Sequence, residues 1–396
     1  MEGEEKKGNY RVCMKKVRIL GGGISGLTCA INLAREGVEV EVYEIHNNSG
    51  CRFHGDFQGL ENWSSHQDAL QDLQSKNIDL DFEHIPIKEI RILNEKEEVW
   101  LNFKKPMFYL VERGTAKHSF DQAIKEQAIS EGVEIHFKKT IPESKADIIA
   151  YGPKKATAKA YGINFKTKSE DGTTVLLSDK AAFKGYSYLL IHDKRASLCS
   201  VVFREHQKIK KYFEYTKKYF EKSGIKIKNP KKIGGIGYFH FPPLLSKNKT
   251  IYIGEAAGLQ DFLWGFGMRI ATTSGYLGAK SILERKNYID LINSRLGKKL
   301  KASIVNRFIW EKFSGKDYSY IINKLKEIKG NLEFFRKIFN LESKIQKILY
   351  PIALAWYKVN YSAIFEHRLF CFTTAKSGKD KRCMNSNGTR FSEHDS

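Results

Sequence analysis

Residues 21–26, with the sequence GGGISG, have the composition and spacing of a turn that binds a dinucleotide. They contain the pattern GxGxxG, and they lie between a short apolar run and a segment that favours a helix. Gly21 allows a tight turn, Gly23 lets the backbone approach a pyrophosphate, and Gly26 lets the helix pack closely on the strand. The pattern therefore predicts a site for the pyrophosphate of a dinucleotide.

The elements that must position this turn form a βαβ unit. Residues 17–20 are predicted to form an apolar strand. A helix that includes Ser25 begins at about Ile24, and residues 39–44 alternate between polar and apolar side chains as a second strand does. The free N–H groups at the start of such a helix attract phosphate. Glu44 ends the second strand, where its carboxylate is placed to accept hydrogen bonds from a ribose 2′-hydroxyl. FAD and NAD both satisfy this pattern, and a glycine turn that binds nothing is the remaining alternative.

The rest of the chain predicts an α/β fold in which a Rossmann-like domain is discontinuous. From about residue 163 the pattern favours an antiparallel sheet, and a strand, glycine turn and helix of Rossmann type return at residues 251–284. Basic amphipathic helices and a polar tail follow. We therefore predict a cofactor-binding domain in two parts, residues 15–162 and 251–290. A substrate domain with an antiparallel sheet is expected at residues 163–250. A basic helical region at residues 291–375 and a disordered tail at residues 376–396 complete the chain.

Composition predicts a cytoplasmic protein without a metal site. The apolar fraction is 41%, the first residues are charged and polar, and no stretch of 18 or more apolar residues is uninterrupted. The six cysteines are scattered, without a CxxC pair or the spacing of metal ligands. We expect free thiols rather than disulfides, zinc or an iron–sulfur cluster.

Beyond the βαβ unit, the sequence resembles the geranylgeranyl reductase family of FAD-dependent oxidoreductases. The triplet Gly50-Cys51-Arg52 follows Glu44 and is similar to the Gly-Gly-Arg found after the ribose acid in many FAD oxidoreductases. The resemblance implies that Arg52 approaches the FAD pyrophosphate. A later arginine-then-helix segment implies that Arg113 is a second cation on the flavin side, and a surface arginine is the alternative. FAD is therefore the expected cofactor.

The segment IYIGEAAG at residues 251–258 resembles the family's Gly-Asp-Ala-Ala motif, which contacts the ribityl chain and the flavin ring. Gly254 matches the motif's glycine, and Glu255 replaces its aspartate with a longer side chain. The resemblance implies a role for Glu255 on a ribityl hydroxyl. It also implies that Gly265, Gly267 and Met268 present backbone N–H groups and a helix N-terminus to the electron-rich edge of the isoalloxazine.

Two residues are candidates for the proton donor. The family's reductases carry Cys-Gly-Glu after the ribose acid, whereas this chain has His54-Gly55-Asp56. His54 would replace the cysteine, because a histidine titrates near neutrality and can donate a proton. Cys51 is the rival candidate, and a hydrogen-bonded structural histidine is the alternative for His54.

The family's aromatic sheet motif is matched only loosely, by Tyr186 and Tyr188, and Trp264 is a further expected wall of the substrate pocket. The resemblance implies reduction of carbon–carbon double bonds of an isoprenoid or another hydrophobic small molecule, with NAD(P)H or ferredoxin as the electron donor. The rival functions are another flavin dehydrogenase, a monooxygenase on the same scaffold, or a degenerate flavin-binding component at a membrane.

The C-terminal region is strongly basic. Residues 291–396 contain 21 Lys/Arg and 9 Asp/Glu residues, a net charge of +12 in a chain whose total is +22. The run 347–359 is apolar, flanked by lysines, and bears Trp356 and Tyr357, as interfacial helices do. We expect peripheral association with an anionic membrane or, alternatively, a helix packed on the cofactor domain. Nucleic acid is not expected, because no recognised nucleic-acid module is visible.

Overall fold

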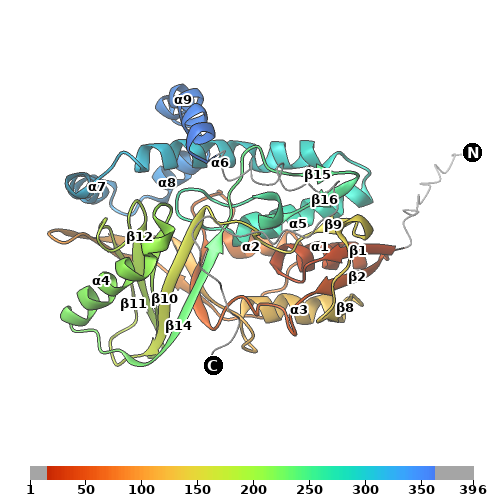
Figure 1. Cartoon of the computed structure of the whole chain (residues 1–396), viewed down its shortest axis with the longest axis horizontal. Helices are drawn as coiled ribbons and strands as arrows, with labels where there is room; N and C mark the ends of the chain where they lie inside the picture. The colour runs from red at the N-terminus through yellow and green to blue at the C-terminus, as the bar shows by residue number, and fades with distance from the viewer. Residues whose placement is uncertain (1–15, 362–396) are drawn as a thin grey trace, which may run out of the picture. The chain divides into compact units, whose positions relative to one another are not determined.

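The computed structural model describes residues 16–361, with no account of the side chain of Lys316 (Figure 1). The chain divides into a first unit that ends at Leu354 and a second unit that begins at Ala355. Within the second unit, the described residues 355–361 are the end of a helix. The predicted tail at residues 376–396 lies outside the described residues.

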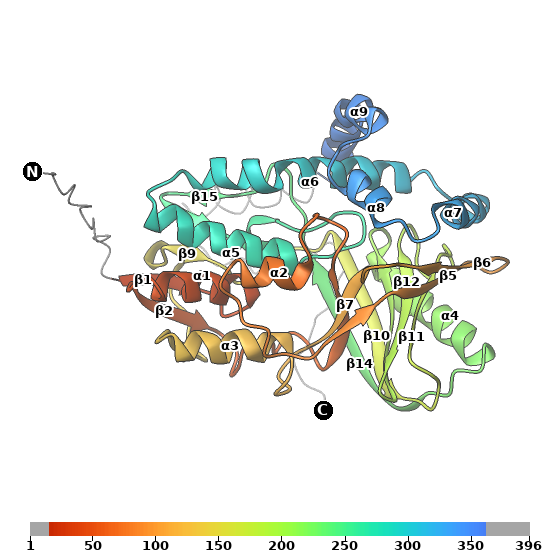
Figure 2. The ribbon, with the colours of Figure 1, turned by 180° about the vertical axis from the view of Figure 1, so that it is seen from behind.

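A mostly parallel sheet carries the predicted βαβ unit. Its strand order is β15-β16-β9-β1-β2-β8, and only the β15–β16 pair is antiparallel. Three helices accompany this sheet, and α1 packs against both α5 and α3 (Figure 2). The bounds are β1 (Lys16–Leu20), β2 (Glu39–Glu44), β8 (Glu134–Phe137), β9 (Ile148–Ile149), β15 (Ser246–Lys247), β16 (Thr250–Tyr252), α1 (Ile24–Ala34), α3 (Phe120–Ser130) and α5 (Met268–Leu283).

The discontinuity of this domain is confirmed by the sheet itself. β16 comes from residues 250–252, yet it pairs in parallel with β9 next to β1. Two short 3₁₀ turns, Glu143–Lys145 and Gly254–Ala257, follow β8 and β16 respectively. The second Rossmann-like segment therefore completes the sheet that the N-terminal segment begins.

A seven-stranded sheet follows the order β14-β10-β13-β12-β11-β5-β6, and all of its pairs are antiparallel except β11–β5. The amphipathic helix α4 covers one face with Phe213 and Phe220, which pack on Ile163 and Phe165. The bounds are β5 (Glu89–Leu93), β6 (Glu98–Asn102), β10 (Ala158–Lys166), β11 (Gly172–Leu176), β12 (Tyr186–His192), β13 (Arg195–Val202), β14 (Lys228–Gly237) and α4 (Ile209–Lys222), with a 3₁₀ turn at His206–Lys208.

The hairpin β5–β6 belongs to this antiparallel sheet although it precedes residue 163 in the chain. Arg91, Ile92 and Leu93 of β5 pair in parallel with β11. A separate three-stranded antiparallel sheet has the order β3-β7-β4, and its strands are interleaved in the sequence with those of the two larger sheets. Its strands are β3 (Asp56–Glu61), β4 (His84–Ile87) and β7 (Phe108–Arg113), and the short helix α2 (Ala69–Gln74) lies between β3 and β4.

The C-terminal helices of the first unit pack into the core rather than forming a separate module. Trp310, Tyr318 and Phe339 are buried in one apolar cluster with Trp63 and Leu101 from the N-terminal half. The bounds are α6 (Tyr288–Trp310), α7 (Gly315–Ile328), α8 (Leu332–Phe339) and α9 (Lys344–Tyr361), the last of which continues into the second unit. None of the helices within residues 16–361 combines the length and apolar character that crossing a bilayer requires.

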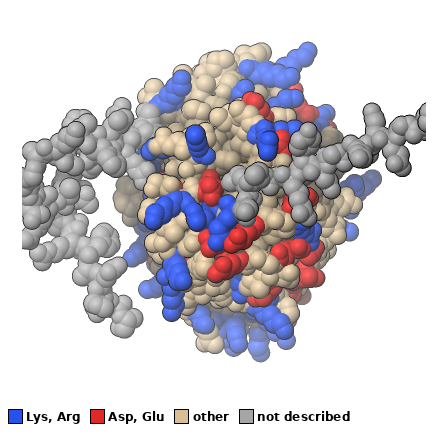
Figure 3. All heavy atoms as spheres, turned by 90° about the vertical axis from the view of Figure 1, so that its right-hand side faces the viewer, with Lys and Arg blue, Asp and Glu red and all other residues tan. Residues whose placement is uncertain are grey.

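Charge is unevenly distributed in the sequence but mixed on the face shown in Figure 3. There, basic side chains are scattered over the described part of the face, and acidic side chains lie among them at the centre and to the right. The excess of positive charge therefore does not form a single continuous patch on this face. What each lysine can bind depends on the charges of the side chains around it.

Candidate cofactor and catalytic site

The first glycine turn has the close contacts that its sequence predicts. Gly21 has φ +117°, and a Cβ there would lie 2.4 Å from the backbone of Ala150. A Cβ at Gly26 would lie 2.1 Å from the carbonyl oxygen of Gly21, so helix and turn approach too closely for any side chain. A Cβ at Gly23, in contrast, would meet nothing within 4 Å. There is thus open space beside the backbone of Gly23, where a pyrophosphate would approach.

The start of α1 leaves its N–H groups available to a ligand. Gly23 is the N-cap residue, and no side chain caps the helix. Ile24 and Ser25 form the first turn of the helix, and both are buried. An uncapped helix N-terminus of this kind stabilises anions.

Glu44 is tied to the glycine turn as well as being placed at the end of β2. One carboxylate oxygen accepts the N–H of Gly22 at 2.8 Å, and the other accepts the N–H of His46 at 2.9 Å. The side chain is 9% exposed. Since each carboxylate oxygen has two lone pairs, Glu44 retains acceptor capacity for ribose hydroxyls. Its role toward a ribose stays a prediction that this geometry permits.

The second glycine turn lies against the first. Gly254 has φ +58°, and a Cβ there would lie 2.5 Å from the hydroxyl of Ser25. Gly275 of α5 is equally close to α1, because its Cβ would lie 2.3 Å from the carbonyl oxygen of Ser25. The small residues of α5 therefore let residues 254–258 reach the pyrophosphate side of the first turn.

Arg52 and Glu255 meet beside these turns. One guanidinium nitrogen of Arg52 lies 2.5 Å from a carboxylate oxygen of Glu255, and the other donates to the carbonyl of Ile236. The two side chains are 35% and 15% exposed. The sequence predicts a separate contact to the cofactor for each residue, and the structure adds that they are bound to each other.

The loop before α5 is open toward the site. A Cβ at Gly265, which has φ +79°, would meet nothing within 4 Å. Gly267 is the N-cap of α5, with no side-chain cap, and Met268 is the buried first residue of the helix. An uncapped helix N-terminus stabilises negative charge, and the role of this one toward a flavin ring stays a prediction.

Arg113 is buried, so the alternative that it is a surface arginine is wrong. It is 6% exposed, and two of its nitrogens bind the two oxygens of Asp121 at 2.8 and 2.9 Å. A third nitrogen donates to Gln58 at 3.2 Å, and the guanidinium lies over the ring of Phe53. Asp121 therefore neutralises the charge of Arg113, which joins β7 to the first turn of α3. Its role as a flavin-side cation stays a prediction.

His54 and Cys51 lie in the loop that links Glu44 to β3. The side chain of His54 is exposed, and its backbone N–H donates to Asp56 at 2.9 Å. Cys51 is half-buried, and its thiol is 3.1 Å from the side-chain oxygen of Asn47. Cys29, Cys51 and Cys199 are free thiols, as expected, and Cys13, Cys371 and Cys383 lie outside the described residues. The roles of His54 and Cys51 in catalysis stay predictions.

The structure brings together the three residues expected to line the substrate pocket. The hydroxyl of Tyr186 donates to the carbonyl of Trp264 at 2.5 Å, and the ring of Tyr188 is 6.2 Å from that of Tyr186. Trp264 also contacts Trp63 and Phe339, with ring centroids 5.8 and 5.3 Å apart. Trp63 and Phe339 complete this aromatic cluster, and sequence reasoning missed both of them.

Beside these tyrosines, three buried titratable groups come together. Burial raises the pKa of Asp56, raises the pKa of Cys199 to about 12, and raises that of Tyr188 well above its usual value. Tyr188 and Cys199 lie directly opposite each other on the paired strands β12 and β13. Asp56 is the acid of the His54-Gly55-Asp56 triplet, so the sequence indicates that it lies near His54. Cys199 is a lone cysteine, and no sequence pattern indicates that it lies in this group.

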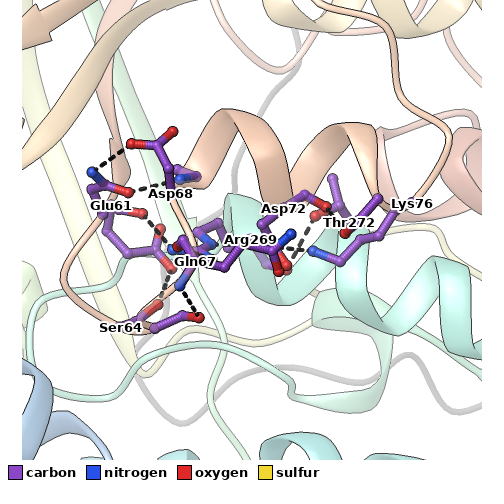
Figure 4. Close-up of polar contacts among 12 residues, drawn as sticks. Glu61, Ser64, Gln67, Asp68, Asp72, Lys76, Arg269 and Thr272 are labelled. Carbon is purple, nitrogen blue, oxygen red and sulfur yellow. Dashed lines mark hydrogen bonds and ion pairs between the residues drawn. The ribbon is translucent and has the colours of Figure 1, made fainter.

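A buried ionic network fixes the start of α5 (Figure 4). Arg269 binds Asp72 at 3.0 Å and donates to the carbonyl oxygens of Glu61 and Gln67. Lys76 binds the same carboxylate oxygen of Asp72 at 2.5 Å. Burial lowers the pKa of Lys76 to about 8, because its charged form loses hydration. This network ties α5 to α2 and β3, and no sequence motif indicates it.

Glu61 and Lys299 border two small cavities next to this network. The inner cavity, of about 20 Å³, also touches Asp261, Phe266 and Trp63. Burial raises the pKa of Glu61, and one of its carboxylate oxygens has no hydrogen-bond partner. The cavity has room for about one water molecule. These residues belong to the packing behind the loop 260–267 rather than to the glycine turns.

One group of potential metal ligands occurs within residues 16–361. The ligand atoms of Glu41, Glu134 and His136 lie within 4.8 Å of one another on β2 and β8. Lys16 binds the carboxylate of Glu41 at 2.9 Å, so this group is already compensated by a lysine. None of its three residues belongs to either glycine turn.

Comparisons with known proteins agree with this geometry. Residues 19–58 match the family model of an NAD(P)-binding Rossmann-like domain. No curated protein matches the chain significantly in sequence. Among solved structures, a geranylgeranyl bacteriochlorophyll reductase-like protein from Thermoplasma acidophilum matches with a TM-score of 0.60 and 17% identity, over 90% of this chain and 98% of its own.

Two further structures share the fold. A flavin-dependent brominase matches with a TM-score of 0.61 and 16% identity, over 86% of this chain and 98% of its own. A flavoprotein/dehydrogenase from Cytophaga hutchinsonii matches with a TM-score of 0.57 and 13% identity, over 86% of this chain and 99% of its own. The predicted fold class, a Rossmann-like α/β domain with an antiparallel-sheet domain and C-terminal helices, is confirmed. At these identities the likeness concerns the fold alone.

Proposed function

We propose that this protein is an FAD-dependent oxidoreductase that reduces carbon–carbon double bonds of an isoprenoid or a similar hydrophobic molecule. The observation that carries the proposal is the meeting of two glycine turns, at residues 21–26 and 254–258, beside Glu44 and Arg52. Flavin-dependent proteins of the same fold support FAD as the cofactor. The reductase-like protein of similar fold supports the alkene as substrate.

The residues present fit an extended dinucleotide. Glu44 would hold the adenosine ribose, the amides around Gly23 and Ser25 would hold the pyrophosphate, and Glu255 would accept from the ribityl chain. The open position at Gly23 supports this fit, because the protein itself fills nothing there. The N-terminus of α5 would stabilise negative charge on the reduced ring.

Reduced flavin, when bound, supplies the hydride for one alkene carbon, and the other carbon needs a proton. In this chain, His54 and Cys51 are the candidates to deliver that proton from the loop before β3. Tyr186, Tyr188 and Trp264 would hold the apolar substrate and exclude water. NAD(P)H or ferredoxin would return electrons to the protein after each turnover.

The decisive experiment uses the purified full-length protein under anaerobic conditions. It should be yellow, with about one FAD per chain, and its photoreduced form should be reoxidised by a polyprenyl substrate such as geranylgeranyl diphosphate. Colourless protein that takes up NAD but not FAD would contradict the cofactor. Reoxidation that requires oxygen would instead favour a monooxygenase, and reoxidation by neither would favour the degenerate flavin-binding component.

A further inference from the structure

The helix α9 carries an exposed apolar stripe made of Ile345, Ile348 and Ile352. These side chains are 67%, 72% and 55% exposed, which places them among the most exposed large apolar residues of the described chain. The three positions are spaced by three and four residues, so they share one side of the helix within an arc of about 60°. We call this set the isoleucine stripe.

The orientation of the stripe is fixed by the opposite side of the same helix. Gln346 is 5% exposed, and its amide donates to Asn306 of α6 and to the carbonyl of Ile338 of α8, both at 2.7 Å. Ala353 on that side is fully buried. The inner face of α9 is therefore already occupied, and the isoleucine stripe faces outward. Val359 of the second unit continues the same spacing in sequence and is 80% exposed.

The charge beside the stripe has one sign. Lys344 and Lys347 are exposed, and residues 344–361 contain three lysines and no acidic residue. The nearest preceding acid, Glu342, is bound to Arg336 at 2.9 Å and does not compensate these lysines. On the helix, Lys344 projects beside the isoleucine stripe, and Lys347 lies further round the helix, between the stripe and the buried face.

We propose that the isoleucine stripe docks α9 on the surface of an anionic lipid bilayer. Apolar side chains on an exposed helix face, bordered by lysines, enter the headgroup region while the lysines contact lipid phosphates. A second copy of the chain is the poorer occupant. Three isoleucines supply far less than the roughly 800 Å² per partner of a stable protein interface, and the lysines would repel their symmetry mates.

This inference refines the expected membrane contact at residues 347–359. Tyr357 is only 2% exposed, so it is not available to lipid in this structure. The stripe that is available begins earlier, at Ile345. The inference is independent of the proposed reaction, because it concerns a helix face that touches neither glycine turn.

The test measures co-sedimentation of the full-length protein with vesicles of phosphatidylcholine and phosphatidylglycerol in equal parts. Two variants divide the contribution: Ile345→Ser with Ile348→Ser and Ile352→Ser, and Lys344→Gln with Lys347→Gln. Each should weaken binding by on the order of tenfold or more, and only the lysine variant should remove the dependence on added salt. Vesicles of phosphatidylcholine alone should bind the wild type weakly.

Ile129→Ser is the matched control, because Ile129 is 47% exposed on a different helix, α3. It should bind vesicles as the wild type does. Equal binding by the wild type and the triple serine variant overturns the proposal. So does a wild-type dimer in sedimentation equilibrium that the triple variant abolishes without any vesicle binding, since a second copy would then be the occupant. Far-UV circular dichroism and the thermal midpoint confirm that each variant is folded.

Discussion

Arg52 and Glu255, separated by 203 positions in the chain, form an ion pair of 2.5 Å between the loop after β2 and the turn after β16. The pair joins the two sequence segments that build the predicted cofactor domain. Because Glu255 already binds Arg52, the carboxylate of Glu255 and an anionic ligand would compete for the same guanidinium group.

Arg52→Met should weaken FAD binding about tenfold or more, because a charge-assisted hydrogen bond to the pyrophosphate contributes about 1.5–3 kcal/mol. Glu255→Gln should weaken it less, since the lost ribityl contact is offset by release of Arg52. Fluorescence titration of the FAD-free protein measures both. Arg91→Met, at the partly exposed Arg91–Glu98 pair of the antiparallel sheet, is the control. A larger loss for Glu255→Gln than for Arg52→Met would contradict this balance.

Gly275→Ala should lower the free energy of unfolding by about 1–3 kcal/mol, because the new Cβ would lie 2.3 Å from the carbonyl of Ser25. FAD affinity should fall in the same variant, since Ser25 belongs to the first glycine turn. Urea unfolding and FAD titration check the two effects. Gly297→Ala in α6 is the control: its Cβ would meet nothing within 4 Å, so stability should rise by about 0.5–1 kcal/mol.

His240 should make the protein less stable in mild acid. Burial, with a smaller effect of Lys155, lowers the pKa of His240 to about 4 from its ordinary 6.5. The unfolded chain therefore binds the proton first, so the contribution is fully present above pH 6.5 and is lost as the pH falls toward 4.

His240→Gln should reduce the loss of unfolding free energy between pH 7 and pH 5 by about 1 kcal/mol, after allowance for partial exposure of the ring. Urea unfolding at the two pH values gives this difference. His118→Gln, at an exposed histidine, is the control. Identical pH dependence in the wild type and His240→Gln would show that His240 is not the group responsible.

His54→Ala separates a catalytic role from a structural one. If His54 donates the proton, flavin reduction should be unchanged and reoxidation by the alkene should slow about a hundredfold or more. Cys51→Ala tests the rival in the same stopped-flow assay. Equal losses in both half-reactions would assign His54 to the shape of the loop, where its backbone already binds Asp56 and Asn164.

The parts of the fold that sequence reasoning predicted are those with local physical causes. Gly21 and Gly26 are required by contacts within a few residues or with one neighbouring strand, and such steric demands leave a recognisable pattern. The pair Arg113–Asp121 and the network around Arg269 could not be predicted, because their partners are chosen by the packing of β7, α2, α3 and α5. A charged residue in a sequence does not indicate whether its partner is a ligand or another side chain.

The hairpin β5–β6 shows the same limit for domain boundaries. β5 and β6 follow each other in the sequence and pair with each other, but nothing in residues 89–102 indicates that β5 also pairs with β11. Pairing between distant strands depends on the surface that the rest of the fold presents. The aromatic cluster around Trp264 shows the same limit, since Phe339 contacts Trp264 from a helix with no motif of its own.

The contact of Phe339 with Trp63 and Trp264 has a consequence for how such a protein can diversify. The glycine turns are built without any residue of α8, whereas the aromatic cluster around Trp264 includes one. On the proposed function, substitutions in α8 would therefore change the preferred hydrophobic substrate while leaving cofactor affinity intact. A chimera that replaces only residues 332–339 with those of a protein of similar fold would then differ in selectivity but bind FAD as before.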